Sequence, residues 1–168
     1  LKAEVRGCKA LREAKKIDWW NKGLSATDLA TLAKLIPVLP ALEELHLNEE
    51  SGSAGPDVGG LFEELRTGAL RLPAVTHFDL EGVCVGDAGA SALAAALDKR
   101  ALPQLNTLYL TDAAIGDPGL VALAPALRRR TALEELALRD NPFGDEGLEA
   151  LVAPPPADAP PPQADALA

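Results

Sequence analysis

The chain contains only two histidines, His46 and His77, and each stands two residues from a carboxylate, Glu44 or Asp79. Imidazole and carboxylate together can ligate a metal ion or form an acid–base pair. We expect the two histidines at the same position of adjacent strands, which lie about 4.8 Å apart. An open sheet face lacks the water-excluding pocket that catalysis usually needs. We therefore favour two surface histidines that make the face pH-sensitive, over a metal site or a catalytic pair.

Three glycine–aspartate blocks could be mistaken for phosphate or calcium loops, but they lack the lysine of a P-loop and the dense carboxylates of a calcium loop. Each stands before a helical pattern, so we expect its aspartate to cap that helix by accepting its first N–H groups. We also expect the second glycine to let the helix pack close to the strands. The blocks are Gly86-Asp87-Ala88-Gly89, Gly116-Asp117-Pro118-Gly119 and Gly144-Asp145-Glu146-Gly147.

The remaining chemistry-bearing residues do not indicate an enzyme or a cofactor. No serine stands in a nucleophile elbow. The run Arg128-Arg129-Arg130 falls at a helix C-terminus, where cations interact favourably with the helix dipole, and it is too short to indicate nucleic-acid binding. We therefore expect a non-enzymatic protein with no cofactor and no metal.

Composition and charge narrow the class of partner. The 168 residues carry a net charge of −9, so nucleic acid is a poor partner and a basic protein a better one. No apolar run reaches the roughly 18 residues of a membrane span. Cys8 and Cys84 form no CxxC pair, and we expect two reduced thiols in a cytoplasmic protein. Because the sequence has no methionine, we interpret it as a piece of a longer protein or a processed product.

The elements that must position these residues recur along the chain. Each of five units opens with apolar residues at its first, fourth and sixth positions, and the last two alternate with polar residues, which predicts a short strand with one buried face. The second half switches to helical spacing, as at Leu120, Leu123 and Leu127. A Leu-Pro link ends the helix and leads to the next strand. The units begin near Ala14, Leu42, Val75, Leu105 and Leu133, and the links contain Pro40, Pro73 and Pro103.

Two segments break this pattern. Residues 48–60 form a Gly/Ser/Glu-rich stretch, which we interpret as an enlarged surface loop with the helix resuming near Leu61 or Phe62. Residues 154–168 are proline-rich and contain too few large apolar side chains to offset the chain entropy lost on folding, so we expect a disordered tail. The folded domain is then 1–153, and residues 1–16 could hold a partial helix that caps its front.

An LxxLxL strand, an I/F-G-D-x-G-L turn and an LxxxL helix in a unit of about 28 residues resemble the leucine-rich repeat family, most closely its ribonuclease-inhibitor-like class. The resemblance covers residues 14–152 and implies an α/β solenoid, with parallel strands on a concave face and helices on a convex face. The family usually has Asn or Cys at the ninth position of each unit, where the side chain ties successive turns together. Only Asn141 matches; the other units have Lys22, Glu50, Val83 and Ala113.

The resemblance also implies which side chains face the concave surface. We expect Trp20 and Tyr109 to be aromatic anchors, because aromatic residues are scarce in this chain and typical of binding hot spots. The surrounding charges are mostly acidic, which would attract a basic partner and speed its encounter. A solvated face, and Trp20 as cover for the first unit, are the alternatives. The candidate binding residues are Trp20, Glu44, His46, His77, Asp79, Glu81, Tyr109, Asp112, Glu135 and Arg139.

The function that we predict is a protein–protein interaction module. Two alternatives stay open, both from the resemblance: a regulator of a small GTPase, similar to Ran GTPase-activating proteins, or the sensor region of a larger immune-receptor-like protein. The proline-rich tail could also be a ligand for an SH3-type domain.

Overall fold

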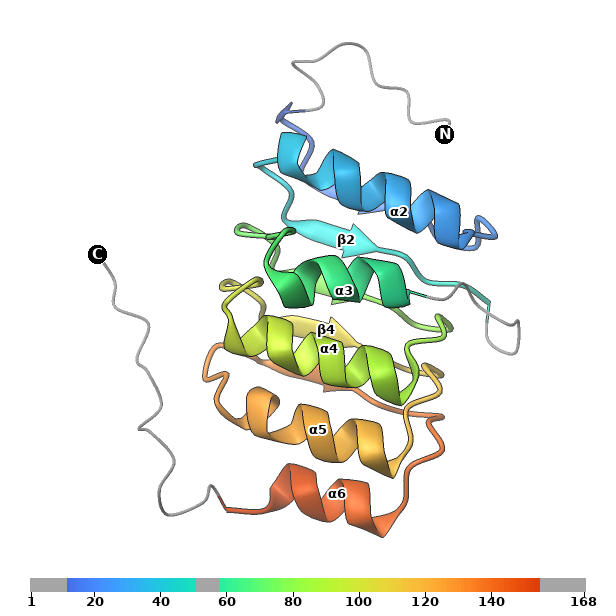
Figure 1. The fold of residues 1–168 in the computed structure, drawn as a ribbon, viewed down its shortest axis with the longest axis vertical. Coiled ribbons are helices and arrows are strands. Elements are labelled where there is room, and N and C mark those ends of the chain that lie inside the picture. Colours follow the sequence, from blue (N-terminus) through green and yellow to red (C-terminus); the bar gives the residue numbers. More distant parts are fainter. Residues whose placement is uncertain (1–11, 51–57, 155–168) are drawn as a thin grey trace.

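The computed structural model describes residues 12–50 and 58–154, and in this part of the chain strands and helices alternate as the repeat predicts (Figure 1). The strands are β1 (Lys16–Asp18), β2 (Glu44–His46), β3 (His77–Asp79), β4 (Thr107–Tyr109) and β5 (Glu135–Ala137). The helices are α2 (Ala26–Leu35), continued by the 3-10 turn η1 (Ile36–Val38), then α3 (Gly59–Thr67), α4 (Gly86–Asp98), α5 (Asp117–Arg128) and α6 (Asp145–Val152). The predicted α/β repeat solenoid is confirmed.

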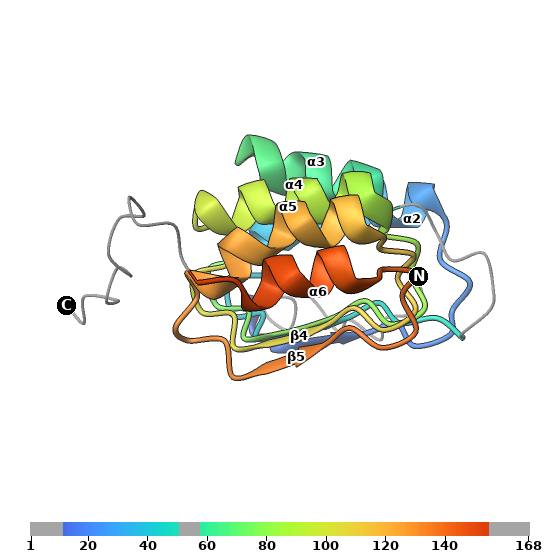
Figure 2. The ribbon, with the colours of Figure 1, turned by 90° about the horizontal axis from the view of Figure 1, so that it is seen from below.

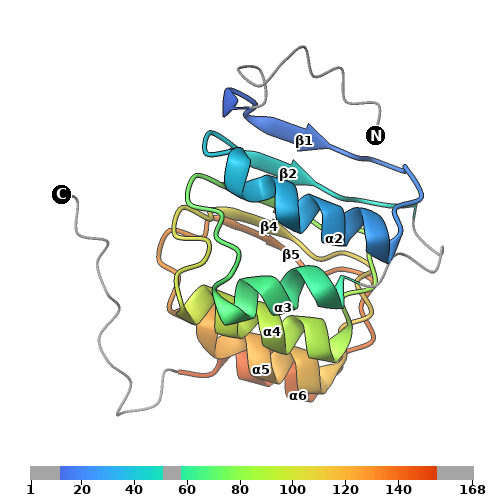
Figure 3. The ribbon, with the colours of Figure 1, turned by 45° about the horizontal axis from the view of Figure 1, so that its top comes forward.

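The strands form one parallel sheet in the order β1-β2-β3-β4-β5, so each unit pairs with the units before and after it. The helices all lie on one side of this sheet (Figure 2). The other side, which we call the open face, carries none of the described helices (Figure 3). After each short strand, the helix returns the chain to the end of the sheet at which the strands begin. The next strand therefore pairs in parallel with the previous one, and the units stack.

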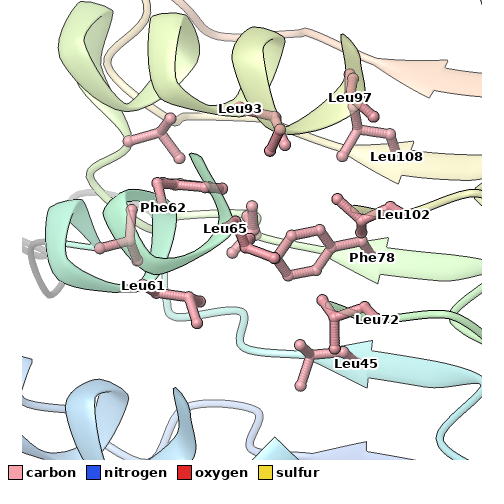
Figure 4. Close-up of a cluster of buried hydrophobic side chains, with 14 of the residues drawn as sticks. Leu45, Leu61, Phe62, Leu65, Leu72, Phe78, Leu93, Leu97, Leu102 and Leu108 are labelled. Atoms are coloured by element: carbon pink, nitrogen blue, oxygen red, sulfur yellow. The ribbon is translucent and has the colours of Figure 1, made fainter. Parts of the chain in front are cut away.

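The core lies between the sheet and the helices. The apolar strand positions are buried at Leu45, Phe78 and Leu108, which are register neighbours on β2, β3 and β4 and are each 0% exposed. Buried helix residues such as Leu65 of α3 and Leu93 of α4 point toward them from the helix side of the sheet (Figure 4). The predicted leucine frame is therefore the core, and a fully buried leucine contributes roughly 1.5–3 kcal/mol.

The expected helix caps are wrong in one respect: the aspartates of the first two glycine–aspartate blocks cap the following helix, not their own. Asp87 Oδ1 accepts the N–H groups of Gly116 at 2.7 Å and Gly119 at 3.1 Å. Asp117 Oδ1 accepts those of Gly144 at 2.7 Å and Gly147 at 2.8 Å. Each carboxylate thus joins two units as well as satisfying orphan N–H groups of a helix.

This arrangement also explains the second glycine of the last two blocks differently from our expectation. A Cβ on Gly119 would lie 2.5 Å from Asp87 Oδ1 and 2.9 Å from Asp87 Cα, and one on Gly147 would lie 2.8 Å from Asp117 Oδ1. The glycine makes room for the preceding helix start, not for the strand layer. Gly116 is the N-cap residue of α5, so Asp117 is the first residue of that helix.

Asn141 has the tie that the repeat predicts for its position. Its Oδ1 accepts the N–H groups of Ala113 at 3.1 Å and Ile115 at 3.0 Å, and its Nδ2 donates to the carbonyl of Leu110 at 2.6 Å. Sequence reasoning missed the corresponding group in the second unit, which is Glu49. Its carboxylate accepts from Gly23 N at 3.2 Å and Leu24 N at 2.9 Å.

The three arginines of residues 128–130 tie helices of different units together instead of serving only the dipole of α5. Arg130 donates to the carbonyls of Leu97 and Leu102 at 3.2 and 2.9 Å. Arg129 pairs with Asp98 of α4, and Arg128 donates to the carbonyl of Ala150 in α6. These guanidinium groups satisfy carbonyls at helix ends that would otherwise lack partners.

The two irregular segments lie partly outside the described residues. Residues 51–57 of the expected loop and 155–168 of the expected tail are not described, and neither are residues 1–11 of the expected front cap. Helix α3 begins at Gly59, two or three residues before the predicted restart near Leu61 or Phe62.

Candidate binding surface

The open face is built from the polar positions of the strands and from the residues that follow each strand. In β2 the burial alternates, with Leu45 buried and Glu44 and His46 half-exposed. The period of two places the two polar side chains on the side away from the helices. The parallel register then aligns equivalent side chains of all five strands across this face.

A polar network crosses three strands of the open face. Lys16 Nζ lies 3.3 Å from Glu44 Oε2, and Glu44 Oε2 lies 3.2 Å from His46 Nε2. The other ring nitrogen, His46 Nδ1, lies 3.3 Å from Asp79 Oδ2. A neutral imidazole donates to only one of its two carboxylate neighbours, whereas a protonated one donates to both. Asp79 is only 8% exposed, and its second oxygen accepts the N–H of Glu81 at 3.1 Å.

The register corrects our expectation that His46 and His77 occupy the same position. His46 pairs with Asp79, and His77 pairs with Glu44, two residues earlier along the strands. Each histidine thus has a carboxylate as its register neighbour on the adjacent strand. His77 Nδ1 lies 2.9 Å from Thr76 Oγ1 instead of a carboxylate. Within residues 12–50 and 58–154, no group of three or more His, Cys, Asp or Glu side chains could hold a metal ion.

Tyr109 and Glu135 form a second polar pair, on β4 and β5. The hydrogen bond from the tyrosine hydroxyl to Glu135 raises the pKa of Tyr109, and the nearby charges of Glu135 and Asp79 add to the shift. Tyr109 therefore stays a neutral donor over the whole physiological range. It is the register neighbour of Asp79, so the tyrosine pair lies next to the histidine network.

The residues after the strands play mixed roles. Trp20 is 60% exposed and is the most exposed aromatic side chain among the described residues. Arg139 is exposed, and Glu81 is half-buried. Asp112 is at φ +50°, and Asn21 and Asp140, at the same position of other units, are also left-handed, at +48° and +58°. Asn and Asp tolerate this conformation better than other side chains, so a turn accounts for these residue types.

Fewer acidic side chains thus line the open face than the sequence indicates. Glu49, which follows β2, is 6% exposed and ties the first two units together. Asp112 and Asp140 form turns. The acidic residues that line the strands themselves are Asp18, Glu44, Asp79 and Glu135, with Glu81 directly after β3. Lys16, which our candidate set omitted, is the cation of the network.

Comparison with known families supports the interpretation of the repeat. A family model described as Leucine Rich repeat matches residues 73–94, 102–124 and 131–152. These three segments are similar to leucine-rich repeats. The three matched segments each span the end of one link, a strand and the start of a helix, β3 to α4, β4 to α5 and β5 to α6. No curated protein matches the chain.

Leucine-rich repeats generally form protein-interaction modules, and members of the family are typically non-enzymatic binding scaffolds. Among the described residues, nothing indicates catalysis. No helix in this part of the chain is long and apolar enough to cross a membrane. Cys84 is an exposed free cysteine, while Cys8 lies outside the described residues.

We expect the pKa of Glu44 to depend on its hydrogen bonds within this network. The hydrogen bond from His46, followed by that from Lys16, lowers the Glu44 pKa. A lowered carboxyl pKa stabilises the folded state above the unfolded pKa of about 4.3, and this contribution is lost as the pH falls through the folded value. We expect His46→Ala to raise the Glu44 pKa, as followed by carbon-13 NMR of the side-chain carboxyl. His77→Ala is the matched control and should leave it unchanged; equal shifts in both variants would contradict the network.

Proposed function

We propose that this protein binds a basic protein partner on its open face, through shape and charge and without catalysing a reaction. The residues that carry the interaction are Trp20 and Tyr109 as anchors and the strand carboxylates around them. Asp79 and His46 hold the centre of the face in one arrangement. The partner contributes lysine or arginine side chains, or both.

The single observation that carries this proposal is an exposed tryptophan that follows β1, together with a network of carboxylates on a sheet face that none of the described helices covers. Trp20 is 60% exposed, although tryptophan usually buries most of its area. The carboxylates of Glu44, on β2, and Asp79, on β3, flank His46. Aromatic rings and carboxylates are groups that bind a guanidinium or ammonium group.

The finer assignments belong to the same proposal. The repeat is of the ribonuclease-inhibitor-like class, because each of the last units alternates a strand with an α-helix within about 28 residues. The folded domain spans residues 1–153, with an inserted loop at 48–60 and a tail at 154–168. A cytoplasmic location follows from the exposed thiol of Cys84, which a reducing compartment protects.

A displayed library of random peptides tests the proposal and requires no identified partner. Peptides are selected on the wild-type protein, with a variant carrying Glu44→Gln, Glu81→Gln and Glu135→Gln used for counter-selection. We expect the selected peptides to be rich in Lys and Arg, to bind about tenfold or more tightly at 50 mM than at 300 mM salt, and to bind Trp20→Ala at least tenfold more weakly.

The control removes the same charge from the helix side, with Glu64→Gln, Asp98→Asn and Glu149→Gln, and should retain the selected peptides. Affinity that does not change with salt would refute the electrostatic part. Peptides that bind the open-face variant as tightly as the wild type would refute the site itself.

A further inference from the structure

The stack of described units ends at β5 and α6. The surface of this last unit has the features of two inner surfaces on which the next unit packs. At the two preceding junctions an aspartate at the helix start binds two glycine N–H groups of the next unit, Asp87 at one and Asp117 at the other. Asp145 occupies the same place in α6. Within the described residues, no N–H group bonds to its carboxylate.

The apolar side chains of this last unit are more exposed than their counterparts in the preceding unit. Leu148 of α6 is 46% exposed, whereas Leu120 at the same position of α5 is 0% exposed. Val152 is 79% exposed. The surface is also hollowed, because Leu133, Leu136 and Leu151 line an open depression of about 270 Å³ beside β5 and α6. The corresponding leucines of the preceding unit, Leu105, Leu108 and Leu123, are buried.

Charge and shape at the front of the stack argue against a second copy of this chain as the occupant. At the place where the inner units have Gly116 and Gly119, the first unit has Ser25 and Asp28. Asp28 is engaged in a capping box with Ser25, accepting its N–H at 3.0 Å. Stacking on a second copy would bring the Asp28 carboxylate against Asp145, where two N–H donors are required.

The sequence after α6 lacks the groups that the junction uses. At the inner junction Glu134 N donates to the carbonyl of Asn106 at 2.8 Å. The residue one repeat period after Glu134 is Pro162, which has no N–H to donate. The segment contains no Gly-x-x-Gly either.

We propose that the surface formed by β5 and α6 binds a partner βα unit whose helix begins with Gly-x-x-Gly. The two glycine N–H groups bind the Asp145 carboxylate, the partner strand pairs in parallel with the free edge of β5, and its apolar side chains cover Leu148 and fill the depression. This inference concerns the end of the stack and is independent of the open face.

An extended chain supplies such a unit. Residues 125–152 are duplicated directly after Val152, which continues α6 in register and places copies of Gly144 and Gly147 the same 27 and 30 residues after Asp145 that separate them from Asp117. We expect the midpoint of thermal unfolding to rise by about 5 °C or more, because the unit buries the exposed leucine surface. Asp145→Ala should lower the midpoint of the extended chain by about 3–6 °C and that of the unextended chain by less than about 1 °C.

Glu149→Ala is the matched control: it removes the same charge from the exposed side of α6 and should have the same small effect in both chains. An extended chain no more stable than the unextended one, or an Asp145→Ala effect equal in both, overturns the proposal. Two further results on the unextended chain overturn it. One is a dimer by sedimentation that Leu148→Asp dissociates, which makes a second copy the occupant. The other is a lower midpoint after deletion of residues 155–168, which makes that segment the occupant.

Discussion

Phe78→Ala is expected to lower the free energy of unfolding by about 3–5 kcal/mol, the range for removing a buried phenylalanine from a packed core. Phe78 is 0% exposed on β3, the middle strand of the sheet. Its ring centroid lies 6.3 Å from that of Phe62 in α3, at a tilted angle of 56°. Figure 4 shows its ring among leucines of strands, links and helices.

The size of this effect follows from the one-dimensional architecture. Each unit contacts only its neighbours, so a cavity at the middle unit weakens both of its junctions. Few other large side chains are available to fill it, because the chain has only three phenylalanines, two tryptophans and one tyrosine. A small domain is commonly stable by only about 5–15 kcal/mol, so the loss is a large share of the total.

Phe143→Ala is the matched control for this prediction. The same Phe→Ala change is made there at a position that is only partly buried, close before α6. Its substitution should cost about 1–2 kcal/mol, because less apolar area returns to water. Urea unfolding followed by circular dichroism measures both values. If the two variants lose the same free energy of unfolding, the assignment of Phe78 to the centre of the core is wrong.

The sequence predicts much of this fold because the repeat constrains the strands and the helices at once. Leu108 and Leu123 could be placed on the buried sides of a strand and a helix from periodicity alone, and both are 0% exposed. Periodicity is a local property, and local properties are what a single sequence displays. The same reasoning predicts the candidate open-face residues as a set, through the alternation of β2 and its neighbours.

What the sequence did not predict are contacts between units. Asp87 looks like a cap for its own helix, since the pattern cannot distinguish a local N–H from one 29 residues later. The expected alignment of His46 with His77 is two residues out of register, because it ignores the apolar residues Leu45 and Phe78, which pair with each other. Helix α5 also continues through Pro125, which has no N–H to donate to the carbonyl of Val121, and Val121 lies on an exposed side of the helix.

Gly82→Ala is the second substitution for which we expect a large loss, about 2–5 kcal/mol in the free energy of unfolding. Gly82 is at φ +70°, where a residue with a Cβ is disfavoured by about 1–2 kcal/mol. A Cβ there would also lie 2.3 Å from the backbone oxygen of Glu49 and 3.0 Å from its carbonyl carbon. Relieving such an overlap in packed structure costs typically about 1–3 kcal/mol.

The overlap, more than the backbone angle, makes glycine necessary at this position. Asn21 and Asp112 have the same left-handed angle in other units and carry side chains. Gly82→Asn should therefore relieve much of the conformational cost and still be strongly destabilising. Gly60→Ala is the control, because its Cβ would meet nothing within 4 Å inside α3. That change should be neutral or stabilising by about 0.4–1 kcal/mol.

The consequence of Gly82→Ala should extend to the first unit, because Glu49 connects three units. Its N–H donates to the carbonyl of Glu81 at 2.9 Å, while its carboxylate holds the N–H groups of Gly23 and Leu24. Displacing the Glu49 backbone moves that carboxylate away from them. We expect amide hydrogen exchange at Gly23 and Leu24 to accelerate in Gly82→Ala and to keep its wild-type rate in Gly60→Ala. Unchanged protection at these two amides, together with a loss of global stability, would show that the strain is relieved at the third unit without passing through Glu49.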